Sequence, residues 1–120
     1  MSESKNSKQY DLEDRTFLFA KNVRILIRKI PKDIPNIEDS RQLVRASGSV
    51  GANYIEANES LSKKDFVMRI KISRKESKES RYWLRLLHIE DDGLNNECQA
   101  LITEVTELMN IFGAILQKSK

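Results

Sequence analysis

The chain has 120 residues, a length typical of one domain, and its formal net charge is +3 at pH 7. Hydrophobic residues make up 39% and charged residues 32%, with only four glycines and two prolines, which argues against a disordered chain and favours a helical globular one. No apolar run reaches the roughly 18 residues of a membrane span, and the polar N-terminus lacks the apolar core of a signal peptide. We therefore expect a cytoplasmic protein with no membrane partner.

The first half of the sequence predicts two helices separated by prolines. The first runs from about Leu12 to Ile30 and ends there because Pro31 and Pro35 push the preceding residues away from helical angles. The second runs from Asn36 to Asn58, with Asn36 as the predicted N-cap.

The second half predicts two more helices. A capping-box-like start at Ser62 opens the third, which continues to about Asp91. The following Asp92-Gly93 predicts a left-handed helix stop. The fourth helix then runs from Asn95 or Asn96 to about Gln117.

Apolar and small residues at alternating spacings of three and four predict the contact faces of these helices. The fourth helix carries the seam Cys98, Leu101, Val105, Leu108, Phe112 and Ile115. The third carries Phe66, Ile70, Ser73, Ser77, Ser80, Leu84 and Leu87, and we expect its serines to face the small residues Gly48, Gly51 and Ala52 of the second. Short loops then imply an all-α, antiparallel up-down-up-down four-helix bundle over residues 11–118, preceded by a disordered lead-in over residues 1–10.

Apolar side chains remain outside these seams. The first helix is apolar nearly all round, and the third carries a second apolar group: Met68, Ile72, Trp83 and Leu86. Because large exposed apolar patches are rare on soluble monomers, we interpret this group as an oligomer interface. The alternative is that a wide core covers these residues.

Positive charge is concentrated on the third helix. Between Ser62 and His88 the chain carries nine Lys or Arg and three acids. Seven of the nine lie on one side of a helical wheel and form the predicted nucleic-acid-binding face: Lys64, Lys71, Arg74, Lys75, Lys78, Arg81 and Arg85. Such a face suits phosphate backbones, and Tyr82 on the same side suits stacking on an unpaired base. The alternative is a solvated face that pairs between molecules with Glu97, Glu104 and Glu107 of the fourth helix.

Residues that would carry catalysis or bind a cofactor are missing from the sequence. The single His88 and the lone Cys98 belong to no spaced ligand set, and no Glu-x-x-His pair or phosphate-binding loop occurs. We predict neither an enzyme nor a metal or cofactor site.

One edge of the second helix carries polar residues at helical spacing. These are Gln42, Arg45, Ser49, Asn53 and Glu56. We interpret them as a buried hydrogen-bonded network that fixes helix register, with a ligand site as the alternative.

The central part of the chain resembles a known family. The resemblance lies in Arg45-Ala-Ser-Gly-Ser-Val-Gly-Ala-Asn-Tyr-Ile-Glu-Ala57, in Ser62-Lys-Lys-Asp-Phe66, in Lys71-Ile72 with Lys75-Glu-Ser-Lys-Glu79, and in Tyr82-Trp-Leu-Arg-Leu-Leu87. These segments are similar to the bacterial four-helix bundle proteins encoded by intervening sequences of large-subunit ribosomal RNA genes. Accessory proteins of diversity-generating retroelements are related to them.

The resemblance implies a non-enzymatic bundle that assembles into a five-fold ring with a basic exterior. Its implied partners are nucleic acid and, in the retroelement branch, a reverse transcriptase. It marks Asn53, Glu56, Lys75 and Glu79 as family-typical polar positions, and Glu79 is therefore added to the predicted network. The expected function is an oligomeric nucleic-acid-binding accessory protein; the alternative is a scaffold that docks an acidic protein.

Overall fold

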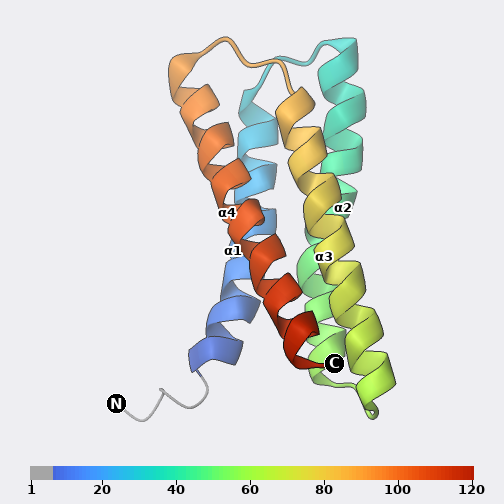
Figure 1. The fold of residues 1–120 in the computed structure, drawn as a ribbon. Helices are drawn as coiled ribbons and strands as arrows, with labels where there is room; N and C mark the ends of the chain where they lie inside the picture. Colours follow the sequence, from blue (N-terminus) through green and yellow to red (C-terminus); the bar gives the residue numbers. More distant parts are fainter. Residues whose placement is uncertain (1–6) are drawn as a thin grey trace.

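The computed structural model describes the backbone of residues 7–120 and the side chains of residues 12–120. Four helices form in this range: α1 (Ser7–Lys29), α2 (Ile34–Asn58), α3 (Lys63–Leu86) and α4 (Asp92–Lys118). Each packs against its two neighbours in an up-down-up-down bundle (Figure 1). The predicted all-α architecture is thereby confirmed. The predicted disordered lead-in stays a prediction, because residues 1–6 lie outside the described part; α1 begins at Ser7.

The bundle core follows the predicted seam of α4. Cys98, Leu101, Val105, Leu108 and Phe112 are all buried. They pack against one apolar side of each of the other three helices. Burying such residues supplies the main stabilisation of the fold, at about 1.5–3 kcal/mol for each large side chain.

Serines occupy the centre of the α3 seam, as predicted. Ser73, Ser77 and Ser80 are fully buried. The Ser73 hydroxyl donates to the backbone carbonyl of Val50 on α2 over 2.9 Å, whereas Ser77 and Ser80 donate to carbonyls of their own helix. Small side chains therefore bring α3 close enough to α2 to hydrogen-bond to its backbone.

The glycines of α2 do not face these serines, so that prediction is wrong. A Cβ on Gly51 would lie 2.9 Å from Thr16 Oγ1 of α1, and a Cβ on Gly48 would lie 3.2 Å from the Arg24 guanidinium of α1. The glycines allow close approach of α1, because α3 meets the opposite side of α2.

The prediction that Asn36 caps α2 is wrong as well. Asp33 is the N-cap, and its carboxylate accepts from the Asn36 N–H at 2.9 Å. The Asn36 side chain is 1% exposed and reaches across to the α3–α4 loop. It donates to the carbonyls of Pro31 and His88, and it accepts from the His88 N–H at 2.9 Å.

This contact helps to explain why α3 ends at Leu86 rather than near Asp91. The Asn36 side chain hydrogen-bonds to both the N–H and the carbonyl of His88, so these two groups need no partners in a longer helix. Asp91 instead caps α4, accepting from the Leu94 N–H at 2.9 Å. Gly93 lies in the first turn of α4, and no glycine of the chain has a positive φ, so the predicted left-handed stop is absent.

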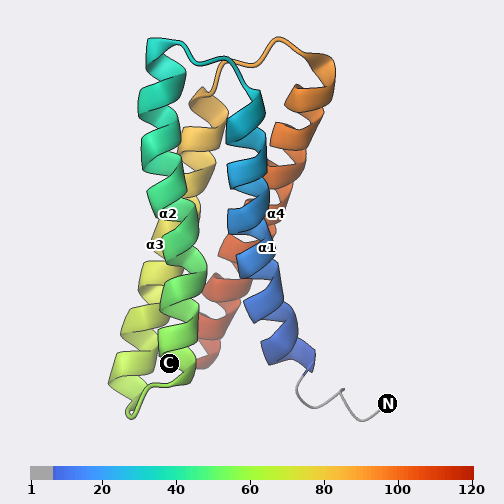
Figure 2. The same ribbon diagram turned by 180° about the vertical axis from the view of Figure 1, so that it is seen from behind.

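The two ends of the bundle differ. The α1–α2 and α3–α4 loops lie together at one end, the α2–α3 loop and the C-terminus lie at the other, and α1 and α4 cross near the middle of the bundle in these views (Figures 1 and 2). By length and composition, α4 is the single helix of the described chain that would suffice to cross a membrane. A helix in the core of a soluble protein can have the same length and composition, and Phe112 of α4 is fully buried inside the bundle.

Replacing Gly51 with alanine is expected to destabilise the protein by about 1–2 kcal/mol, because the new methyl group would press on buried Thr16. Gly113→Ala is the matched control. Its Cβ would meet only Arg74 Nε at an ordinary 3.5 Å, and helix propensity alone should stabilise it by up to about 1 kcal/mol. Urea unfolding of both variants measures the difference. Equal effects would contradict the close α1–α2 contact.

Replacing Asn36 with alanine is expected to cost about 2–4 kcal/mol, since its side chain loses three hydrogen bonds, two to His88 of the α3–α4 loop and one to Pro31 of the α1–α2 loop. The exposed Asn96 of α4 provides the control, and Asn96→Ala should stay within about 0.5 kcal/mol of the parent. Denaturant midpoints report both values. A loss for Asn36→Ala no larger than that of the control would show that the loops hold together without it.

Candidate nucleic-acid interface

The seven predicted cations lie on the side of α3 away from its buried serine stripe, and Arg74 and Arg81 among them border α4. We call this set the basic ridge: Lys64, Lys71, Arg74, Lys75, Lys78, Arg81 and Arg85. All are exposed except Arg81, which is half-buried and donates to Thr106 Oγ1 of α4 at 3.3 Å. Arg74 Nε lies 3.5 Å from where a Cβ on Gly113 of α4 would stand. The structure therefore brings the predicted residues onto one continuous surface.

An open hollow lies at the middle of the basic ridge, with a volume of about 490 Å³. Four ridge cations line it: Lys71, Arg74, Lys75 and Lys78. Half-buried Leu116 of α4 adds an apolar side, and Glu79 is the single acid of the lining. The hollow combines a concentration of positive charge with one apolar contact surface.

Three acids of α4, Glu97, Glu104 and Glu107, pair with α1 rather than with the basic ridge. Arg15 donates to both carboxylate oxygens of Glu104, at 2.9 and 2.7 Å, and also reaches Glu107 at 2.9 Å. Lys29 pairs with Glu97 at 2.9 Å. Within residues 12–120, no ridge cation lies within 4.0 Å of a carboxylate. The three acids that the alternative interpretation assigned to a neighbouring molecule are thus already engaged within the chain.

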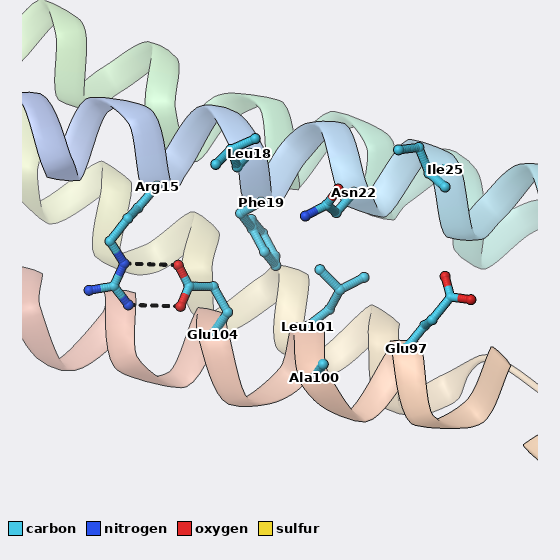
Figure 3. Close-up of a pocket in the computed structure, with 9 residues that line it drawn as sticks. All are labelled: Arg15, Leu18, Phe19, Asn22, Ile25, Glu97, Ala100, Leu101 and Glu104. Carbon is cyan, nitrogen blue, oxygen red and sulfur yellow. Dashed lines mark hydrogen bonds and ion pairs between the residues drawn. The ribbon is translucent and has the colours of Figure 1, made fainter. Parts of the chain in front are cut away.

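A groove between α1 and α4 is the second surface feature, and the sequence did not single it out. It has a volume of about 410 Å³ (Figure 3). Phe19 and Leu101 line its core side, exposed Leu18 and Ile25 stand on α1, and the Arg15–Glu104 pair lies at one end. The signal in the sequence that could have indicated this groove is the apolar character of the first helix on nearly all sides.

The polar edge of α2 forms a smaller network than predicted. Asn53 donates to the Ser49 carbonyl and hydroxyl at 2.9 Å, and it accepts from Arg69 of α3 at 3.0 Å. Arg69 was not predicted, although its helical position faces α2.

The remaining predicted network members are Arg45, Glu56 and Glu79, which are all exposed, as is Gln42. The structure therefore does not join them into one buried network. Near them, burial raises the pKa of Glu76; Glu79 raises it further, while Lys75 and Arg45 lower it.

The predicted oligomer interface forms two small areas rather than one patch. Met68 is 49% exposed and Leu86 is 47% exposed. Ile72 and Trp83 are half-buried, and Trp83 packs against the core. The stretch of α3 between Ile72 and Trp83 carries Glu76 and Glu79, which separates the two areas.

The described residues contain no cluster of three His, Cys, Asp or Glu side chains that would hold a metal ion. Cys98 is buried and its Sγ lies 3.4 Å from the Leu84 carbonyl; burial raises the pKa of the thiol, which disfavours the reactive thiolate. His88 is exposed and pairs with Glu90 at 3.0 Å. These groups lie apart and form no shared site.

Sequence similarity assigns this bundle to a family. The profile of the 23S rRNA-intervening sequence proteins matches residues 8–114, nearly the whole chain. The chain belongs to the 23S rRNA-intervening sequence protein family. The resemblance of its central segments is thereby confirmed, and the match extends into α1 and α4.

A solved structure shares the fold of this family member. It is the crystal structure of a protein of unknown function from the S23 ribosomal protein family of Bacteroides thetaiotaomicron. The two chains are 26% identical with a TM-score of 0.76, and the match covers 88% of this chain and 97% of the other. No curated protein is significantly similar in sequence.

A double-mutant cycle on Arg15→Gln and Glu104→Gln tests whether α1 holds the acids of α4. Both side chains are about one-quarter to one-third exposed, at 26% and 30%, so we expect a coupling energy of only about 0.5–1 kcal/mol, which decreases with added salt. Urea unfolding of the four proteins measures it. Zero coupling at low salt would mean that Glu104 is free to act elsewhere.

Proposed function

We propose that this protein is a non-enzymatic accessory protein that binds the backbone of nucleic acids through the basic ridge and acts as an oligomer. One observation carries the proposal: seven cations share one side of α3, and within residues 12–120 none has a carboxylate partner. Like charges one helical turn apart cost stability, so a surface that served solubility alone would alternate signs.

Phosphates would relieve that repulsion. Each cation that neutralises a phosphate releases condensed counterions, which gives binding that weakens steeply with salt and depends little on base sequence. The family name refers to intervening sequences of 23S rRNA, so a structured RNA is the first ligand to test. The resemblance to accessory proteins of retroelements adds a reverse transcriptase to the proposed partners.

Oligomerisation would place several ridges on one particle. Met68 and Leu86 on α3, together with Phe17 and Leu18 on α1, expose apolar surface that a second subunit would cover. Linked ridges then bind one nucleic acid more tightly than single ones. A pentamer is the assembly that the family resemblance favours, and light scattering on the purified protein measures its mass.

The triple variant Arg74→Gln, Lys78→Gln, Arg85→Gln tests the basic ridge. Losing three phosphate contacts should flatten the slope of log affinity against log salt by about 2–3, and should weaken binding on the order of a hundredfold near 0.1 M salt. Fluorescence anisotropy with a structured RNA and a DNA duplex, across a salt series, provides both numbers.

The control variant removes the same charge elsewhere. Lys21→Gln, Arg28→Gln, Arg41→Gln also loses one lysine and two arginines, all exposed, from α1 and α2. It should bind nearly as the parent does, apart from a small effect of net charge. No binding by the parent at low salt, or equal losses in both variants, would refute the proposed function.

A further inference from the structure

An aromatic side chain stands among the cations of the basic ridge. Tyr82 is 56% exposed, and Lys78 and Arg85 lie one helical turn before and after it on the same side of α3. Its ring meets Trp83 edge-on, with centroids 5.0 Å apart and an interplanar angle of 78°. Trp83 itself packs against the core. Tyr82 is therefore an exposed ring with a fixed support, between two cations.

The shape of the basic ridge disfavours insertion into a duplex. The major groove of B-DNA, about 12 Å wide, admits a single helix. α3 has α2 on one side and α4 on the other, so it cannot enter the groove as a separate rod. The major groove of duplex RNA is narrower still and closed to side chains.

The ridge is also straight. Lys64 and Arg85 lie about 32 Å apart along α3, at about 1.5 Å per residue. The phosphate backbone of a duplex winds around the helix axis, so its phosphates would move away from a straight row of cations. An extended single strand can follow the row and place successive phosphates on successive cations. Only a single strand also offers unpaired base faces for an aromatic ring to stack on.

The hollow beside Leu116 supports the same ligand. It lies between α3 and α4, about one to three turns before Tyr82 along the ridge, and three lysines and one arginine line it together with Leu116. Alternation of cations with apolar or aromatic surfaces matches the alternation of phosphates and bases in a single strand.

We propose that the basic ridge binds single-stranded nucleic acid, with an unpaired base stacked on Tyr82. This inference rests on the proposed function, and it specifies the strandedness of the ligand. The edge-on contact with Trp83 holds the ring in place before binding, which reduces the entropy lost when a base stacks on it.

The test uses the full chain with an unstructured single-stranded oligonucleotide and a duplex of the same length. Tyr82→Ala should weaken single-strand binding about fivefold or more and leave duplex binding within twofold. Tyr82→Phe keeps the ring and should bind as the parent does. Ile55→Ala, which removes an exposed apolar side chain from α2 outside both the basic ridge and the proposed subunit contact, is the matched control and should change neither affinity.

A second measurement is independent of affinity. The chain has one tryptophan, Trp83, in contact with Tyr82, so single strands should change its fluorescence and duplexes should not. Duplex binding equal to or tighter than single-strand binding, together with no effect of Tyr82→Ala, would overturn this inference and leave the proposed function standing. A Tyr82→Ala variant that changes oligomeric mass instead would assign Tyr82 to a subunit contact and overturn it too. Absence of binding to either ligand would refute both.

Discussion

The close approach of α3 to α2 determines which side of α3 faces solvent. The buried stripe of Ser73, Ser77 and Ser80 brings the helices near enough for a serine hydroxyl to reach the Val50 carbonyl. Rotating α3 about its axis would replace these small groups by long cations or Trp83, and a close-packed interface has no room for them. With the rotation fixed in this way, the basic ridge points outward beside α4. The candidate interface is thus a consequence of how the core packs.

Opposite charges are separated between two sides of α4. Its acids face α1, where Arg15 and Lys29 pair with them, and its other side meets the basic ridge through Thr106, Gly113 and Leu116. Gly113 has no side chain to hold Arg74 away from the helix surface. Within residues 12–120, this partition leaves the ridge cations without a carboxylate partner, although the neighbouring helix carries the acids.

Much of the fold could be predicted because seams are local: periodicity along one helix identified the buried residues of α3 and α4 and the side of α3 that carries the cations. The helix ends could not be predicted so well. The end of α3 depends on Asn36, which lies 52 residues from His88 along the chain, and no local pattern reports such a contact.

Contacts between helices were also harder to predict than the buried positions within one helix. Gly51 was expected to face α3 but contacts α1, because a glycine indicates that another helix comes close without indicating which one. Arg69 was missed as the partner of Asn53, because its charge suggested solvent rather than a hydrogen bond between helices.

The hydrogen bonds of Asn36 connect the two hairpins of the bundle, α1 with α2 and α3 with α4, at the loop end. Two of them join the first turn of α2 to His88 in the α3–α4 loop, besides the packing of the helices along their length. Toward the other end, Arg15 joins α1 to α4 through both carboxylate oxygens of Glu104. Losing Asn36 would therefore remove a link at one end of the bundle only, while the Ser73 hydroxyl would still hold α3 on α2 and keep the orientation of the basic ridge.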